Sequence, residues 1–136
     1  MAFVEIDKTP GSKVPKPFER ELKVLLAPET HSDVEGFTLL YSTLAPNGGC
    51  TDFHSHETSG ELMIFVSGTG RAWLGGEEFA LRPGVAMYAP PGVEHKTMNT
   101  GDEPLQIACV FVPPASSDYI LKNVSAADGR EGGERG

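Results

Sequence analysis

The sequence has little cysteine, no long apolar run and no excess of basic residues. Its two cysteines, Cys50 and Cys109, are too few for a disulfide framework, and we expect small, partly buried thiols in a reducing compartment. No run of about 18 apolar residues is present to span a bilayer, and residues 1–7 lack the features of a signal peptide. The 11 basic and 19 acidic residues give a net charge of −8, which disfavours binding to nucleic acid or an anionic membrane. We therefore expect a cytoplasmic protein that binds neither.

The length of 136 residues suits one compact domain with two differing ends. Residues 1–20 are expected to form an extended N-terminal arm, because residues 8–17 contain three prolines and three lysines. Residues 21–112 are expected to form the folded core, and residues 113–136 a C-terminal tail that is disordered from about residue 126. Within the tail, residues 119–121 are apolar enough to pack back on the core or on a second subunit.

Short alternating runs separated by Gly, Pro, Asn and Asp fill the middle of the chain, with no helical stripe. This pattern predicts an all-β domain, and about nine short strands in one domain imply a sandwich or a barrel. The expected strands are 21–27, 37–45, 50–56, 61–67, 71–74, 77–81, 86–90, 94–99 and 105–112.

Three of the four histidines lie in one pattern with a carboxylate. His54 and His56 are one residue apart, Glu61 follows, and His95 comes after a stretch rich in Gly and Pro. Residues i and i+2 of a strand share a face, so the expected strand over 50–56 would present both histidines together. Imidazole nitrogens with a carboxylate suit borderline divalent metals, so these four side chains form a candidate metal site.

Ten positions at fixed intervals match two motifs of a known family. The first, G-x5-H-x-H-x4-E-x6-G, is matched by Gly48, His54, His56, Glu61 and Gly68. The second, G-x5-P-x-G-x2-H-x3-N, is matched by Gly84, Pro90, Gly92, His95 and Asn99. With 15 residues between the motifs, the chain resembles the cupins. One departure is Val85, a turn position where many relatives have Asp.

The resemblance implies a double-stranded β-helix, or jelly-roll barrel, around one metal site. The implied ligands are His54, His56, Glu61 and His95, binding one divalent transition metal that could be Fe, Mn, Ni, Co or Zn. The alternative is a cupin that uses this cluster structurally or leaves it empty. Two further candidates receive no role: Glu57 should point outward after His56, and His31 lies in a polar loop.

Alternation along the strands predicts which side chains face the pocket. The expected pocket residues are Met63, Phe65, Leu74, Met87, Thr97 and Asn99, with Ala72 and Ala89 on the same inner face. Asn99 suits a structural hydrogen bond better than metal ligation. For the last strand, two registers remain open: either Ile107, Cys109 and Phe111 or Gln106, Ala108 and Val110 face inward.

The same alternation places Arg71, Trp73, Tyr88 and Lys96 on the outer face of the barrel. No cation from the central strands is therefore expected in the pocket. A phosphosugar or dicarboxylate substrate is therefore disfavoured unless Arg20 or Lys23 reaches inward, and a neutral or metal-chelating ligand is favoured.

An apolar outer face is expected on the strand that carries Glu61. Leu62, Ile64 and Val66 alternate with the inward residues, so the N-terminal arm or a second subunit should cover them. A homodimer is the default expectation.

Three functions fit these observations. The leading one is an Fe(II)-type dioxygenase acting on an enolisable ketone, diketone or catechol-like compound, because the inward positions supply no second acid or base. The alternative is a Lewis-acid isomerase or lyase acting on a sugar or hydroxyketone. A non-catalytic small-molecule-binding cupin ranks third, since a sensor would usually be fused to an effector domain.

Overall fold

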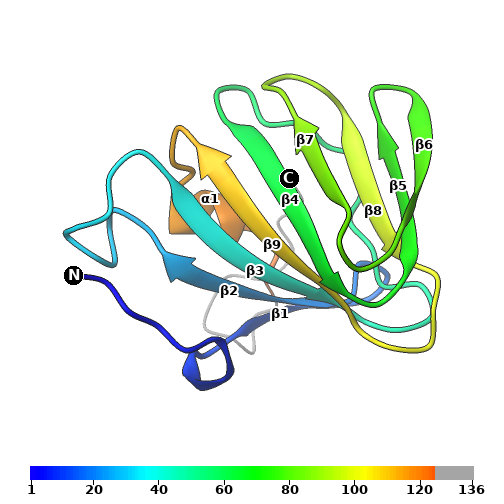
Figure 1. Ribbon diagram of the computed structural model, residues 1–136, viewed down its shortest axis with the longest axis horizontal. Coiled ribbons are helices and arrows are strands. Elements are labelled where there is room, and N and C mark those ends of the chain that lie inside the picture. Colours follow the sequence, from blue (N-terminus) through cyan, green and yellow to red (C-terminus); the bar gives the residue numbers. More distant parts are fainter. Residues whose placement is uncertain (125–136) are drawn as a thin grey trace.

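In a computed structural model that describes residues 1–124, the chain forms two antiparallel β-sheets. The strands are β1 (Ser12–Val14), β2 (Arg20–Leu26), β3 (Thr38–Leu44), β4 (Gly60–Ser67), β5 (Gly70–Leu74), β6 (Glu77–Leu81), β7 (Ala86–Ala89), β8 (His95–Asn99) and β9 (Leu105–Val112). One sheet has the order β1-β2-β3-β9-β4-β7 and the other the order β6-β5-β8, with the smaller sheet at the right of Figure 1. The prediction of an all-β jelly-roll barrel is thereby confirmed.

The core lies between the inner faces of the strands. On β4, Glu61, Met63 and Phe65 are buried, whereas the side chains between them are exposed, as the alternation predicts. Strand β9 pairs with both β3 and β4, and its buried side chains are Leu105, Ile107, Cys109 and Phe111. Of the two alternatives for the last strand, the structure therefore shows the one in which Ile107, Cys109 and Phe111 face inward. Both cysteines are buried and free.

The N-terminal arm is attached to the edge of the larger sheet. Its residues 12–14 form β1, which pairs with β2 from Ser12 opposite Leu22 to Val14 opposite Arg20. A short 3₁₀ helix, η1 (Ile6–Lys8), is held by a hydrogen bond from Lys23 Nζ to the Ile6 carbonyl. The sequence pattern missed β1, because three residues between prolines give no visible periodicity.

The C-terminal segment packs back on the barrel. Thr38 Oγ1 donates to the Ala115 carbonyl at 2.8 Å, and the short helix α1 (Ser117–Ile120) follows. The expectation that residues 119–121 return to the barrel is confirmed, since these three side chains pack against the core cluster. The expected disorder from about residue 126 lies outside the described residues. No helix within residues 1–124 is long and apolar enough to cross a membrane.

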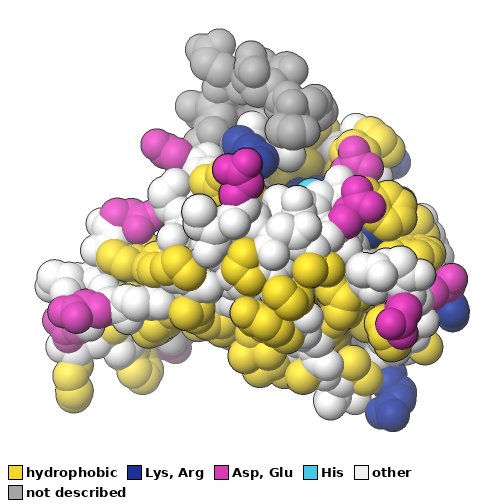
Figure 2. Space-filling view, turned by 90° about the horizontal axis from the view of Figure 1, so that it is seen from above, with side chains coloured by type: hydrophobic (Ala, Val, Ile, Leu, Met, Phe, Trp, Pro, Cys, Tyr) yellow, Lys and Arg dark blue, Asp and Glu magenta, His cyan; other side chains and the backbone are white. Residues whose placement is uncertain are grey.

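The outer face of β4 is left open by the other residues that the structure describes, 1–124. Leu62, Ile64 and Val66 are 38%, 43% and 48% exposed. The arm cannot cover them, because it joins the sheet at β1 whereas β4 lies near the opposite edge. Figure 2 shows hydrophobic side chains gathered in a band across the face that it draws. The expected homodimer stays a prediction.

The strand expected over residues 50–56 was wrong, and the reason is one extra residue. Cys50 bridges Met98 and His54 bridges His95, so the segment advances 54 − 50 = 4 residues while β8 advances 98 − 95 = 3. This mismatch is the signature of a bulge, and a regular ladder cannot run through it. At the irregularity, Asp52 Oδ1 accepts a hydrogen bond from the Phe53 backbone N–H at 2.8 Å.

Candidate metal centre

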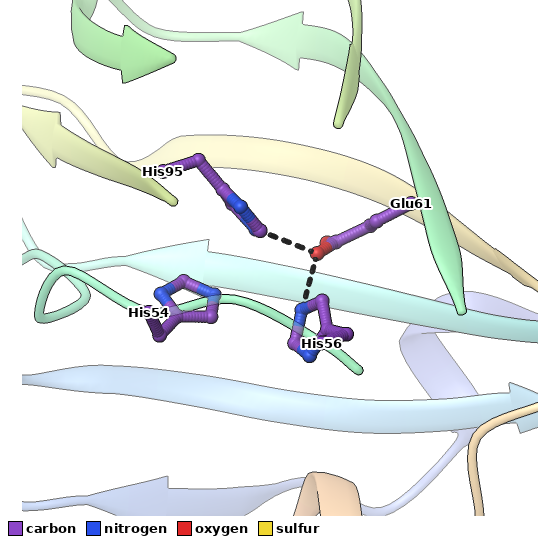
Figure 3. Close-up of side chains that lie close together, drawn as sticks. All are labelled: His54, His56, Glu61 and His95. Atoms are coloured by element: carbon purple, nitrogen blue, oxygen red, sulfur yellow. Dashed lines mark hydrogen bonds and ion pairs between the residues drawn. The ribbon is translucent and has the colours of Figure 1, made fainter. Parts of the chain in front are cut away.

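Three imidazoles surround one carboxylate between the two sheets. His54 and His56 come from the irregular segment before β4, Glu61 is the second residue of β4, and His95 is the first of β8. One ligand atom from each lies within 4.8 Å of every other. Figure 3 shows the four side chains pointing toward one another. The bulged segment therefore brings His54 and His56 to the same point as Glu61 and His95. It does so without the regular strand on which the sequence prediction depended.

The backbone fixes which nitrogen of two histidines faces the centre. His54 Nδ1 lies 2.8 Å from the Asp52 carbonyl, and His95 Nδ1 lies 2.9 Å from the Val93 carbonyl. A carbonyl oxygen only accepts, so each Nδ1 must carry the proton, and in the neutral ring Nε2 holds a lone pair. Both rings therefore present their Nε2 atoms as ligands. This arrangement is typical of metal-binding histidines.

Glu61 binds two histidines through one oxygen. Its Oε1 lies 2.9 Å from His56 Nε2 and 3.2 Å from His95 Nε2, both drawn as dashed lines in Figure 3. Burial raises the pKa of this carboxyl, but the hydrogen bonds from the two histidines outweigh burial and hold it at about 2. Glu61 is therefore ionised at neutral pH, as a metal ligand must be.

The same environment shifts the pKa values of His54 and His95 in opposite directions. Burial, followed by the charge of His95, lowers the pKa of His54 to about 4, so His54 is neutral at neutral pH. For His95, burial lowers the pKa, but the hydrogen bond to Glu61 and the Val93 carbonyl together raise it above its ordinary value. The ionised Glu61 thus favours positive charge at His95, as it would favour a bound cation.

These observations fit a bound divalent metal. Two nitrogens with fixed lone pairs, a third imidazole and an ionised carboxylate converge at one point, and no other cationic side chain lies in ion-pair contact with Glu61 within residues 1–124. Nitrogen and oxygen donors of this kind suit several first-row metals. The expectation of a divalent-metal site is confirmed to the extent that the four residues are placed to bind one.

The four side chains lie in a cavity of about 150 Å³. Of the residues expected to line the pocket, Met63 and Thr97 do so. Phe65 and Met87 lie in the buried core cluster, and Leu74 packs against it. Apolar side chains from three strands of the larger sheet complete one wall: Leu22, Leu40, Ile107, Cys109 and Phe111.

Asn99 lies away from the cavity and joins three backbone segments. It is fully buried, its Nδ2 donates to the carbonyls of Leu44 and Glu103, and its Oδ1 accepts from the Gly101 N–H. Its place is therefore that of a structural hydrogen-bonding residue.

Asn99→Ala should lower the free energy of unfolding by roughly 1–3 kcal/mol, because the buried Leu44 carbonyl loses its hydrogen-bond partner, and the part-buried Gly101 N–H and Glu103 carbonyl lose theirs as well. Denaturant unfolding measures the loss, and metal content per folded chain should not change. Unchanged stability with loss of metal would instead assign Asn99 to the site.

The cavity contains cations that strand alternation did not identify. Arg20, the first residue of β2, lines it, and so does Lys122, which lies just after α1 with Nζ 4.1 Å from the centre of the Tyr119 ring. Lys23, the other residue considered, bonds to Ile6 instead. Arg20 shares the inner face with Leu22, which is the signal that would have found it. Lys122 lies beyond the last strand, where alternation gives no information.

Tyr119 is a further residue of the site that the sequence indicated only as a packing residue. Its hydroxyl lies 2.8 Å from His56 Nδ1, and its ring meets the His56 ring edge-on at 5.6 Å. If His56 binds metal through Nε2, its Nδ1 carries the proton and the tyrosine oxygen accepts it. Helix α1 therefore orients one ligand of the site.

Tyr119→Phe should weaken metal binding by roughly 10–100-fold, the usual cost of removing the hydrogen-bond partner of a ligand. Competition with a chelator of known affinity measures the change. Tyr88→Phe, on the exposed outer face, is the matched control and should bind metal as the wild type does. Equal affinities in both variants would remove Tyr119 from the site.

Residues 40–111 match the model of a family described as cupin domain. An uncharacterised protein of Methanocaldococcus jannaschii is 33% identical over 122 residues, covering 87% of this chain and 95% of that protein. The glucose-6-phosphate isomerase of Pyrococcus horikoshii is 33% identical over 72 residues, which cover 49% of this chain but only 38% of the isomerase. The crystal structure of a predicted oxalate decarboxylase from Thermotoga maritima superimposes with a TM-score of 0.73 at 21% identity, covering 82% of this chain and 98% of that one.

Proposed function

The chain belongs to the cupin family, and from this premise we propose that it is a metal-dependent isomerase or lyase. Its substrate is a small organic molecule whose oxygen atoms chelate the metal. The observation that carries this proposal is the convergence of His54, His56, Glu61 and His95 in a cavity that also contains polar and cationic side chains.

The protein residues supply orientation and a proton. When bound, the metal would act as a Lewis acid that polarises a substrate oxygen. With metal on His56 Nε2, the Tyr119 oxygen would accept a hydrogen bond from His56 Nδ1–H, which leaves the tyrosine O–H free to donate to a substrate atom in the cavity. Burial, followed by the charges of Glu61 and Glu57, raises the pKa of Tyr119, so the hydroxyl keeps its proton at neutral pH.

This proposal reverses the order of the two enzymatic hypotheses drawn from the sequence. The sequence favours oxygen chemistry because the inward strand positions supply no second acid or base, and it disfavours an anionic substrate because they supply no cation. Arg20, Tyr119 and Lys122 line the cavity from the start of β2 and from the segment that begins at α1, so these reasons no longer hold. The partial similarity to an isomerase supports non-oxidative chemistry as well.

Dioxygenase activity is the second candidate, and the apolar wall favours it. Met63, Ile107 and Phe111 face the ligands, and an apolar surface of this kind excludes water from the reacting atoms. The same three His and one Glu would bind Fe(II).

One experiment separates the candidates. Metal-loaded protein is incubated in D2O without oxygen with a panel of hydroxyketones, diketones and hydroxy acids, and exchange of the carbon-bound hydrogen next to the carbonyl or hydroxyl group is followed by NMR. The proposal expects exchange or product without oxygen. Oxygen uptake in air with no anaerobic turnover would assign a dioxygenase, and metal-bound protein with neither activity would assign a non-catalytic binder.

A further inference from the structure

We propose that Arg20 binds a carboxylate of the substrate, which makes the substrate a small hydroxy or oxo acid with chelating oxygens at one end and a carboxylate at the other. The inference rests on the proposed function, because the chelating end needs the metal. It replaces the neutral ligand that the sequence favoured, since that preference depended on a cavity without a cation.

One nitrogen of the Arg20 guanidinium is hydrogen-bonded to backbone carbonyls, and its other two nitrogens have donors left over. Its Nη1 donates to the Phe18 carbonyl at 3.0 Å and to the Cys50 carbonyl at 3.3 Å. Within residues 1–124, Nε and Nη2 have no hydrogen-bond partner. Two anchors on one nitrogen orient the planar group, and the free donors suit the two oxygens of a carboxylate.

No carboxylate of the described chain forms an ion pair with this guanidinium, although the charge of Glu61 acts on it from farther away and opposes the fall in its pKa. The cavity contains two, but Asp52 caps the Phe53 N–H and Glu61 binds His56 and His95. Within residues 1–124 neither lies in ion-pair contact with Arg20. Burial lowers the pKa of Arg20 to about 10, so the guanidinium is still charged at neutral pH. A partly desolvated cation without a counterion is costly, and an anionic ligand would supply the missing partner.

The size and polarity of the cavity narrow the ligand class. A cavity of about 150 Å³ is comparable to one that holds benzene, which suits a ligand of few heavy atoms. Ser42 and Thr97 add hydroxyl groups to the wall of the cavity. Lys122 provides a second positive charge in the same cavity. A short acid with two polar ends matches this distribution.

A matched pair of probes tests the inference by calorimetric titration of the zinc-loaded protein. Malate and 2-hydroxybutanoate share a hydroxy-carboxylate end and differ at the other, where malate has a carboxylate and 2-hydroxybutanoate a methyl group. The wild type should bind malate at least about tenfold more tightly, the scale of one charge-assisted hydrogen bond. Arg20→Met should abolish the preference, and Arg20→Lys should retain part of it. Lys23→Met, on the same strand but outside the cavity, should retain all of it.

Metal content and thermal stability are measured on every variant, so that a failure to fold or to bind metal is recognised. Zinc-loaded Arg20→Met that still prefers malate would overturn the role of Arg20 and leave the proposed function standing. Zinc-loaded wild type that binds both probes equally, or neither, would overturn the assigned substrate class. Wild type that takes up no metal would contradict the proposed function itself.

Discussion

His95→Ala is expected to lose the metal. His95 is 2% exposed and supplies one of the two nitrogens whose lone pair the backbone fixes toward the centre. Removing a ligand should cost more than the roughly 10–100-fold that loss of a ligand's hydrogen-bond partner costs. The metal content after purification should therefore be close to one equivalent per chain in the wild type and near zero in this variant.

The control for this variant is His31→Ala, which removes a side chain that contacts the Thr30 hydroxyl and does not line the cavity. That variant should retain the full metal content. Because His95 is also joined to His54 by two backbone hydrogen bonds, which alanine keeps, the fold should survive. A His95→Ala protein that retains one equivalent of metal would refute the site.

Removal of the metal should lower the melting temperature of the wild type by about 10–20 °C. A ligand present at about 1,000 times its dissociation constant stabilises the native state by about 4 kcal/mol, and each kcal/mol corresponds to roughly 3–5 °C in a domain of this length. The physical reason is the buried carboxylate: without metal, Glu61 has only the histidines as partners.

Scanning calorimetry with and without a strong chelator, followed by metal addition, measures this effect. The expected result is a reversible shift in the wild type and no chelator-dependent shift in His95→Ala, because that variant has no metal to lose. An equal shift in both proteins would mean that the stabilising metal lies elsewhere.

The barrel and the ligand set followed from sequence because both depend on fixed spacing. Alternation placed Glu61, Met63 and Phe65 inward correctly, since each strand has a period of two residues and one face must be buried. The same rule left β9 ambiguous, because nearly every residue from Leu105 to Val112 is apolar. Which face of β9 is buried depends on its pairing with β3 and β4, which are distant in the sequence.

Spacing failed where the chain leaves the regular ladder. The bulge in the 50–56 segment follows from one extra residue relative to β8, which no local pattern reveals. Tyr119 reaches His56 across 63 positions of sequence, and that contact depends on the path of the chain after Val112. Arg20 is the last residue of the expected arm, so strand alternation was not extended to it, although it shares a face with the inward Leu22. These residues, rather than the ligands, changed the proposed chemistry.

Anomalous diffraction from crystals of the metal-loaded protein tests the central claim most directly. We predict one peak per chain, bound by His54, His56, Glu61 and His95 with metal–ligand distances of about 2.0–2.2 Å. A peak at any other position, or no peak in protein that carries a full equivalent of metal, would contradict it.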